Sequence, residues 1–284
     1  MGRAWRLLGG DMRPARARGG FLAAAVAVSV GAFTLTSGAG VAAASSEPTS
    51  GQPAPVPAAP PSPETAPAPK PAHVVLSNER TSTTWAHPVE EIPIRARPEV
   101  RSRTLARTRL ATEDGFPEVY VLLSSFTDAK GSEWMQIRIP GRPNGRTGWV
   151  PRESLAEFHV THWLVEIALR SRRLKAYYNG KLRFNAPVGV GKPSTPTPTG
   201  HFYIREIFKL ASPSNPYWPY AIGTSDYSTL TDWPGGGVVG IHGDFGEPRL
   251  IPGDPSHGCV RMHSRDIAWL APRVSLGTPV HIVA

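Results

Sequence analysis

The sequence predicts an all-β fold class, mainly β with one or two short helices, in two folded modules that follow an N-terminal export segment. Residues 133–140 (EWMQIRIP) alternate with the period of a half-buried strand. Asn179 and Gly180 join two strand-like runs, and Asn-Gly is among the stronger short hairpin signals. A glycine-bounded apolar run that ends at His242 is typical of a buried strand. Residues 264–274 are the best candidate for a helix.

Residues 1–44 have the composition of a secretory signal peptide. Five arginines precede the apolar run at 21–35, and Ala42 and Ala44 supply the small-x-small pattern of a signal-peptidase site. The apolar run is short for a membrane span, which needs about 20 residues. We therefore predict an exported protein of the cell wall or periplasm, which is attached to the membrane only if this segment is retained as an anchor.

Residues 45–72 form a linker rich in proline and alanine. The segment holds ten prolines and six alanines, and proline lacks the backbone donor that helices and sheets require. We predict an extended, semi-rigid spacer that takes no part in a core.

Residues 73–157 have the pattern of a first module made of short strands. A buried run rich in β-branched residues at 118–126 and the alternating run at 133–140 are followed by a stretch dense in turn residues at 141–151. Residues 99–113 alternate less clearly and fit either a loop or a strand. The module contains no cysteine, and we expect it to position the second module without taking part in bond-making.

Residues 160–284 form the second module, and its elements follow in order along the chain. Strands are expected at 164–169, on both sides of Asn179-Gly180, at 200–207 after a proline-rich turn, at 238–242 and at 278–284. The stretch at 209–237 is expected to be a long loop rich in aromatic residues and proline. In the helix at 264–274, Ser264 is predicted as the N-cap and Asp266 lies in the first turn, where the helix dipole favours a negative charge.

The net charge of +9 arises partly from the export segment. Residues 1–44 hold five arginines and one aspartate and thus contribute +4 of it. The rest of the chain has no Lys/Arg-rich run of the kind that nucleic-acid-binding proteins carry, so we predict no nucleic-acid partner. A modest positive field suits an acidic polymer or a carboxylate substrate. The sequence carries no signal for an oligomeric state.

Cys259 is the only cysteine of the chain, so it cannot form an intrachain disulfide. A cysteine nucleophile reacts as its thiolate, and a nearby cation lowers the pKa of a free thiol from about 8.5 toward about 6. We expect Cys259 to be accessible and to have a pKa below that of a free thiol, because His242, His257 and Arg261 surround it. The strand that ends at His242 can bring a base beside it, because the chain between them is rich in glycine and proline and can turn back. Gly258 permits a sharp turn whose backbone N–H groups can face an oxyanion, and Arg261 adds a fixed positive charge.

Two other interpretations of Cys259 stay open. A small buried thiol without a chemical role is one. A zinc site made of His242, His257, Cys259 and His263 is the other. Only one residue separates His257 from Cys259 and no second cysteine is present, which argues against zinc. We predict neither a metal nor a cofactor.

The motif IHG at 241–243, followed by SHGCVRM at 256–262, resembles the signature of the L,D-transpeptidase catalytic domain of the YkuD type. TPTPTGHF at 195–202 resembles the turn that precedes a strand in the same family, and the resemblance covers about 164–284. It implies a β-sandwich or barrel-like catalytic domain that transfers acyl groups between peptidoglycan stem peptides. In that family the thiol attacks a diaminopimelate carbonyl, expels terminal D-alanine and passes the acyl group to the amine of a second stem.

The resemblance also implies roles for individual residues. Cys259 would be the nucleophile and His242 the base, with the Gly243 carbonyl orienting the His242 ring. The residues implied to bind substrate or stabilise the oxyanion are Gly243, Ser256, His257, Gly258 and Arg261. A lid would lie near 209–237, and the aromatic residues that could form it are Tyr217, Trp218, Tyr220 and Tyr227, for which ordinary packing is the alternative.

A second, shorter resemblance lies in the first module. Residues 134–155 (WMQIRIPGRPNGRTGWVPRESL) resemble a bacterial SH3-like barrel, a module often set before cell-wall enzymes. We therefore predict an exported L,D-transpeptidase that contributes to cell-wall cross-linking. The alternatives are a cysteine L,D-carboxypeptidase or peptidase that uses water as acceptor, and a non-catalytic wall-binding protein.

Overall fold

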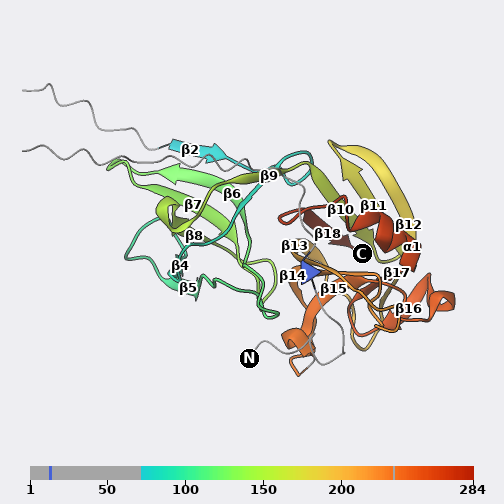
Figure 1. The fold of residues 1–284 in the computed structure, drawn as a ribbon. Coiled ribbons are helices and arrows are strands. Elements are labelled where there is room, and N and C mark those ends of the chain that lie inside the picture. Colours follow the sequence, from blue (N-terminus) through green and yellow to red (C-terminus); the bar gives the residue numbers. More distant parts are fainter. Residues whose placement is uncertain (1–12, 15–71, 233) are drawn as a thin grey trace, which may run out of the picture. The chain divides into compact units, whose positions relative to one another are not determined.

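The computed structural model describes residues 13–14, 72–232 and 234–284 (Figure 1). The predicted signal peptide, apart from residues 13–14, and nearly all of the predicted linker therefore lie outside the described residues. The predicted all-β class is confirmed, because strands dominate both modules and the described part contains one α-helix, α1 (Ser264–Leu270). No helix of that part combines the length and the hydropathy that crossing a membrane requires.

The first module is an antiparallel sheet of eight strands in the described residues. The strands follow the order β5-β4-β8-β7-β6-β3-β9, and β2 pairs with β6. Their bounds are β2 (Ala72–Val75), β3 (Thr83–Ala86), β4 (Pro93–Arg95), β5 (Thr104–Arg107), β6 (Tyr120–Thr127), β7 (Glu133–Arg138), β8 (Thr147–Pro151) and β9 (His159–Thr161). Met135 and Ile137 are fully buried, as the alternation at 133–140 predicts. Because β9 belongs to this sheet, the first module extends past the predicted boundary at 157.

The second module is a closed barrel in the described part of the chain (Figure 1). Its strands follow the order β1-β13-β14-β15-β17-β12-β11-β10-β18, and β13 also pairs with β18, which closes the ring. The bounds are β1 (Arg13–Pro14), β10 (Trp163–Ala168), β11 (Arg173–Tyr178), β12 (Lys181–Gly191), β13 (Gly200–Lys209), β14 (Tyr220–Tyr227), β15 (Val238–His242), β16 (Gly253–Ser256), β17 (Val260–Met262) and β18 (Pro279–Val283). Short 3-10 helices are η2 (Arg152–Ser154), η3 (Pro234–Gly237) and η4 (Pro248–Leu250).

The hairpin prediction is confirmed, whereas the prediction of one long loop is wrong. Asn179 (φ 48°) and Gly180 (φ 71°) form the tight turn between β11 and β12. The stretch expected as a loop at 209–237 contains β14, which pairs with β13 and β15. Small and apolar residues of β14 are buried between these neighbours, so tertiary pairing outweighs the turn-rich composition around the strand.

The predicted N-cap of the helix is also wrong. His263 occupies the N-cap position of α1, with φ −56° and ψ 143°, and Ser264 is the first helical residue. The backbone N–H and the Oγ of Ser264 both donate to Asp244 Oδ2, at 3.2 Å each. A carboxylate from a distant loop thus satisfies the start of the helix, which frees Ser264 to be helical.

The barrel core holds the strands of the predicted site in place. Ile241 and Val260 are fully buried in one apolar cluster with residues of β10, β11 and β18. Ile241 directly precedes His242, and Val260 directly follows Cys259. Burial of one methylene contributes about 0.8 kcal/mol, so these two anchors resist movement of the residues beside them.

The first sheet and the barrel share a buried interface. Trp85, Val119 and Val121 of the first module pack with Tyr203 of β13, whose hydroxyl donates to the Val119 carbonyl at 2.8 Å. Arg205 is 1% exposed and binds the carboxylate of Glu118, which is 0% exposed. The modules are therefore joined by apolar packing and by a buried ion pair.

A buried carboxyl group at the same interface should make the free energy of unfolding depend on pH. Glu206 is buried and accepts a hydrogen bond from Thr112 at 2.7 Å. Burial and the nearby Asp114 carboxylate raise the pKa of Glu206 above its usual value. The folded protein therefore holds a proton that the unfolded chain releases near pH 4.3. This contribution to the free energy of unfolding is fully present at acidic pH and is lost as pH rises through the folded-state pKa.

We expect the melting temperature to fall between pH 5.5 and pH 8.5, and to fall less in Glu206→Gln. Calorimetry of both proteins at the two values of pH tests this. The exposed Glu157→Gln serves as the matched control and should keep the slope of the parent. An identical slope in Glu206→Gln and the parent would contradict the role given to Glu206.

Candidate active site

The structure brings His242 and Cys259 together from two neighbouring strands. His242 is the last residue of β15, and Cys259 lies in the turn between β16 and β17. β15 and β17 pair in parallel, with Ile241 opposite Val260. The backbone N–H of Gly240 donates to the Cys259 Sγ at 3.4 Å. The chain return expected from the sequence therefore occurs.

The His242 ring is held in one tautomer. The residue is 2% exposed, and its Nδ1 lies 2.8 Å from the carbonyl oxygen of Gly243. A carbonyl can only accept, so Nδ1 carries the proton and Nε2 keeps its lone pair. Burial, together with the charge of Arg261, lowers the pKa of His242 to about 3. The ring is therefore neutral near pH 7 and is able to accept a proton at Nε2.

Gly243 allows the segment before β14 to approach His242. A Cβ atom at this position would lie 1.7 Å from the carbonyl oxygen of Trp218. The Gly243 N–H donates to the Tyr217 carbonyl at 3.3 Å, and the Tyr217 ring stands edge-on to the His242 ring with centroids 4.6 Å apart. Any side chain at 243 would push this aromatic wall away from the histidine.

The turn that carries Cys259 is fixed by side-chain hydrogen bonds. Ser256 Oγ donates to the Cys259 carbonyl at 2.5 Å and accepts the Gly258 N–H at 3.1 Å. Gly258 has φ +123°, a region that residues with a side chain rarely adopt. Thr197 Oγ donates to the Gly258 carbonyl at 2.8 Å. Ser256 and Gly258 therefore set the shape of the turn.

His257 and Arg261 have different surroundings. His257 is exposed, and its Nε2 accepts a hydrogen bond from Lys192 Nζ at 3.0 Å. Arg261 is 8% exposed, lies over the Phe245 ring at 4.7 Å and pairs with Glu247 at 2.6 Å. Its Nε is buried without a hydrogen-bond partner among the described residues. Arg261 thus keeps one buried donor that has no partner in the described part of the chain.

The Cys259 thiol differs from the sequence expectation, which was a pKa lowered by His242, His257 and Arg261. Enclosure by protein raises the pKa of Cys259, because burial outweighs the opposing effects of the Gly240 N–H and Arg261. His257 is turned toward Lys192, and His242 is uncharged. The resting pair therefore consists of a neutral thiol and a neutral imidazole.

We expect the alkylation rate of Cys259 to rise with pH to a midpoint above the pKa of free cysteine, about 8.5. Iodoacetamide and intact-mass spectrometry measure this rate, and the chain has no second cysteine to confuse the result. A cysteine-containing peptide is the control. A midpoint at or below that of the peptide would show that enclosure does not destabilise the Cys259 thiolate.

The four aromatic residues expected in a lid are divided between two settings. Tyr217 and Trp218 lie before β14 and next to His242 and Gly243. Tyr220 and Tyr227 are the first and last residues of β14. Tyr227 is 7% exposed, and its hydroxyl donates to Glu113 of the first module. The surroundings of Tyr227 are thus those of the interface between the modules.

Sequence reasoning missed two polar residues behind the thiol, Thr224 and Asp226. Both lie on β14, where they are 1% and 0% exposed. Thr224 Oγ lies 2.6 Å from the Val239 carbonyl and also contacts Asp226 Oδ1. The run TSD between apolar residues was the available signal, but it falls inside the stretch expected to be a loop.

The proposed zinc ligands do not form a cluster. In the ranges that the structure covers, no group of three or more His, Cys, Asp or Glu side chains is arranged to hold a metal ion. His263 occupies the N-cap position of α1, and Nε2 of His257 is engaged with Lys192.

Comparison with known proteins identifies the family. The L,D-transpeptidase catalytic domain family (YkuD) matches residues 162–282. The YkuD protein of Bacillus subtilis (strain 168) is 32% identical over 146 residues, which are 51% of this chain and 73% of that protein. The chain belongs to the L,D-transpeptidase family. The YkuD protein of Bacillus licheniformis is 34% identical over 118 residues, which are 42% of this chain and 64% of that protein.

A solved structure of an Enterococcus faecium L,D-transpeptidase is also similar. It is 29% identical, with a TM-score of 0.33, over 42% of this chain and 48% of that one. The chain thus spans about half the length of that relative. Membership in the L,D-transpeptidase family confirms the predicted enzyme class. The family match covers the barrel, so the SH3-like character of the first module stays a prediction.

Proposed function

We propose that this L,D-transpeptidase is exported and joins peptidoglycan stem peptides through a thioacyl-enzyme on Cys259. The observation that carries the proposal is the pairing of β15 with β17, which places the strand that ends at His242 next to the turn that carries the only cysteine of the chain. A thiol and an oriented imidazole are the two groups that cysteine acyl transfer requires. The family resemblance supplies the substrate class.

Acylation begins when His242 Nε2 takes the thiol proton as the sulfur attacks the diaminopimelate carbonyl. A carbon–sulfur bond forms, and the carbonyl oxygen becomes an oxyanion. The oxyanion collapses, the bond to D-alanine breaks, and the imidazolium returns its proton to the departing amine. The amine of a second stem then attacks the thioester, gives its proton to His242, and releases the sulfur, which regains a proton.

A neutral resting pair is compatible with this sequence of steps. The buried site disfavours a permanent thiolate and imidazolium, because both charges would lose their hydration. The substrate carbonyl relieves this cost for the sulfur, since negative charge passes from the sulfur to the carbonyl oxygen as the carbon–sulfur bond forms. The Gly243 carbonyl holds the Nδ1 proton, so the imidazolium forms without rotation of the ring.

The other predicted site residues take supporting roles in this proposal. Ser256 and Gly258 set the turn so that its backbone faces the reacting carbonyl. The guanidinium of Arg261, whose Nε has no hydrogen-bond partner among the described residues, suits a carboxylate of the stem peptide. His257, at the exposed edge beside Lys192, would contact the stem farther from the thiol.

Mass spectrometry of the intact protein tests the proposal. The mature chain is incubated with a tetrapeptide stem, with and without an amine acceptor. We expect an adduct on Cys259 that the acceptor removes as a cross-linked product, and no adduct in Cys259→Ser. An adduct lost equally fast without acceptor would favour the carboxypeptidase alternative, and the absence of any adduct in the parent would favour a wall-binding protein without activity.

A further inference from the structure

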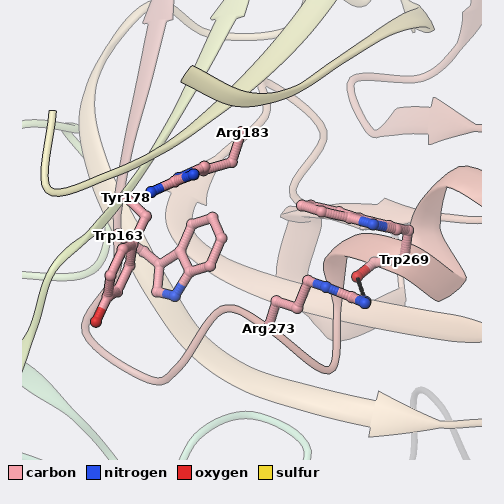
Figure 2. A pocket seen from close by; sticks show the side chains of 5 residues that line it. All are labelled: Trp163, Tyr178, Arg183, Trp269 and Arg273. Carbon is pink, nitrogen blue, oxygen red and sulfur yellow. Dashed lines mark hydrogen bonds between the residues drawn. The ribbon is translucent and has the colours of Figure 1, made fainter. Parts of the chain in front are cut away.

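A pocket of about 280 Å³ opens on the barrel between the hairpin β11–β12 and α1. Its lining comes from β10, β11, β12 and the α1 region, whereas the proposed catalytic pair comes from β15 and the turn before β17. The lining residues, drawn in Figure 2, are Trp163, Tyr178, Arg183, Trp269 and Arg273. The pocket therefore presents three aromatic rings and two guanidinium groups, and no carboxylate.

The aromatic rings form a connected wall. The rings of Trp163 and Tyr178 lie 5.1 Å apart, and Trp163 meets Trp269 edge-on at 6.5 Å. Phe184 stacks on Trp269 at 4.6 Å with an interplanar angle of 11°, which fixes the indole from outside the pocket lining. Arg273 lies over the Trp269 ring at 4.3 Å. Ring contacts of this kind preorganise flat apolar surfaces for a ligand.

The two arginines give the pocket an uncompensated positive charge. Neither Arg183 nor Arg273 forms a salt bridge with a carboxylate in the described ranges of the chain, in contrast to Arg172, Arg205 and Arg261. Arg273 donates to the Trp269 carbonyl at 2.6 Å, which orients its guanidinium and leaves other N–H donors for a ligand. Both side chains are exposed, so a ligand can reach them.

We propose that this pocket binds an acidic sugar, a single saccharide unit that carries a carboxylate or a phosphate. The C–H face of a sugar ring is weakly positive and stacks on the negative face of an indole. Arginine pairs with carboxylate and phosphate through two parallel hydrogen bonds. The volume of about 280 Å³ lies just below the range of drug-sized ligand pockets, about 300–1,000 Å³, and therefore fits one ring. A nucleotide has the same two features, but the chain lacks the Lys/Arg run of a nucleic-acid binder.

Titration of the full mature chain, followed by ligand-observed NMR, tests the site. N-acetylmuramic acid and N-acetylglucosamine 6-phosphate are the two charged probes, which distinguish a carboxylate sugar from a phosphate sugar. N-acetylglucosamine has the same ring without the charge. We expect at least one charged probe to bind at least fivefold more tightly than the neutral one, and Arg183→Ala or Arg273→Ala to remove that difference.

The exposed Arg170→Ala is the matched control and should bind the charged probe as the parent does. Trp163→Phe should weaken both the charged and the neutral sugar, because it trims the aromatic wall. Equal binding of charged and neutral sugars, an equal loss in Arg170→Ala, or tighter binding of a short oligothymidylate would each overturn the proposal. So would the absence of binding at about 10 mM probe.

A second inference concerns the hydrogen bonds behind Cys259. Thr224 Oγ has one proton and contacts two acceptors, the Val239 carbonyl at 2.6 Å and Asp226 Oδ1. The Val239 carbonyl can only accept the Thr224 proton; a neutral Asp226 carboxyl then donates to Thr224 Oγ, whereas an ionised Asp226 competes with Val239 for that proton. Asp226 is 0% exposed, and burial raises its pKa to about 7. A protonated Asp226 therefore heads a chain of hydrogen bonds.

That chain ends at the sulfur. The Val239 carbonyl and the Gly240 N–H belong to one peptide group, and this N–H donates to Cys259 Sγ at 3.4 Å. A hydrogen bond accepted by the carbonyl polarises the peptide and strengthens its N–H as a donor. A stronger donor stabilises the thiolate more than the thiol.

We infer that Thr224 and Asp226 are positioning residues that act on Cys259 through the Val239–Gly240 peptide. The inference rests on the proposed role of Cys259 as nucleophile. When Asp226 loses its proton, Thr224 turns toward the new carboxylate, the peptide loses a donor, and a negative charge appears behind the sulfur. The other charged or titratable groups near this thiol in the described chain are His242 on β15, Arg261 on β17 and Tyr217 before β14.

Alkylation of Cys259 by iodoacetamide across pH 5–10 tests this inference without any acyl transfer. Thr224→Val breaks the chain, and we expect its thiol to titrate at higher pH and to react severalfold more slowly at pH 7.5. Asp226→Asn keeps a donor for Thr224 and cannot ionise, so its alkylation profile should lose the step near pH 7. Profiles of both variants that superimpose on the parent would overturn the inference. If the two variants shift the alkylation profile as expected but the parent protein transfers no acyl group, only the proposed function would be contradicted.

Discussion

Replacing His242 with alanine is expected to slow acylation of Cys259 by about 10²–10⁴-fold, the usual contribution of a positioned base. The enclosed thiol carries its proton near pH 7, because its pKa is raised by burial. His242 ends the neighbouring strand, is neutral at this pH, and has its Nδ1 held by the Gly243 carbonyl, which leaves Nε2 to accept a proton. Without this ring, the sulfur would attack only from the small fraction that ionises unaided.

A carbapenem is a suitable probe, because its strained carbonyl tests acylation without the need for a second stem. The rate of adduct formation is followed by intact mass in the parent, in His242→Ala and in the exposed control His73→Ala. We expect the control to match the parent. The melting temperature of each protein separates a lost base from a lost fold. A folded His242→Ala that acylates as fast as the parent would place the base elsewhere.

Local chemistry determines the parts of the structure that the sequence predicts correctly. Asn179 and Gly180 both adopt positive φ, which a two-residue hairpin requires and few other residue pairs supply. The apolar run before His242 and the SHGC turn are likewise short patterns with their own physical reasons. Such patterns place His242 and Cys259 on neighbouring elements, and the pairing of β15 with β17 brings them together.

Long-range contacts determine the parts that the sequence does not predict. Asp244 caps α1 from another loop, so Ser264 is not the cap that its position suggests. β14 forms because β13 and β15 flank it, despite turn residues on both sides. The elevated pKa of Cys259 likewise depends on burial by segments far away in the sequence. None of these causes lies within a window of ten residues.

The ion pair between Arg205 and Glu118 is the clearest feature that depends on residues far apart in the sequence. Arg205 Nε donates to Glu118 Oε1 at 2.8 Å, and Nη2 donates to Oε2. Glu113 lies 3.0 Å from the same guanidinium. The partners lie in different modules and 87 positions apart. The first module therefore supplies the carboxylates that neutralise a buried arginine of the barrel. This contribution to the barrel's stability goes beyond the positioning role that the sequence predicts.

Replacing Glu118 with glutamine is expected to lower the free energy of unfolding by about 3–5 kcal/mol, because removal of one partner leaves a buried guanidinium without its full countercharge. Glutamine keeps the shape of the side chain, so packing of the interface is preserved. The residual contact with Glu113 places the expected loss toward the lower end of that range. Urea unfolding, read by tryptophan fluorescence, measures the change.

Two further proteins separate the buried charge from other causes. Glu99→Gln removes one partner of the exposed pair Arg97–Glu99, whose side chains are 77% and 55% accessible, and it should change stability by less than about 1 kcal/mol. The double variant Arg205→Met/Glu118→Leu removes both buried charges and should recover most of the loss, since an apolar pair of similar volume needs no countercharge. If Glu118→Gln is as stable as Glu99→Gln, Glu113 alone neutralises Arg205 and the modules are held together by apolar packing.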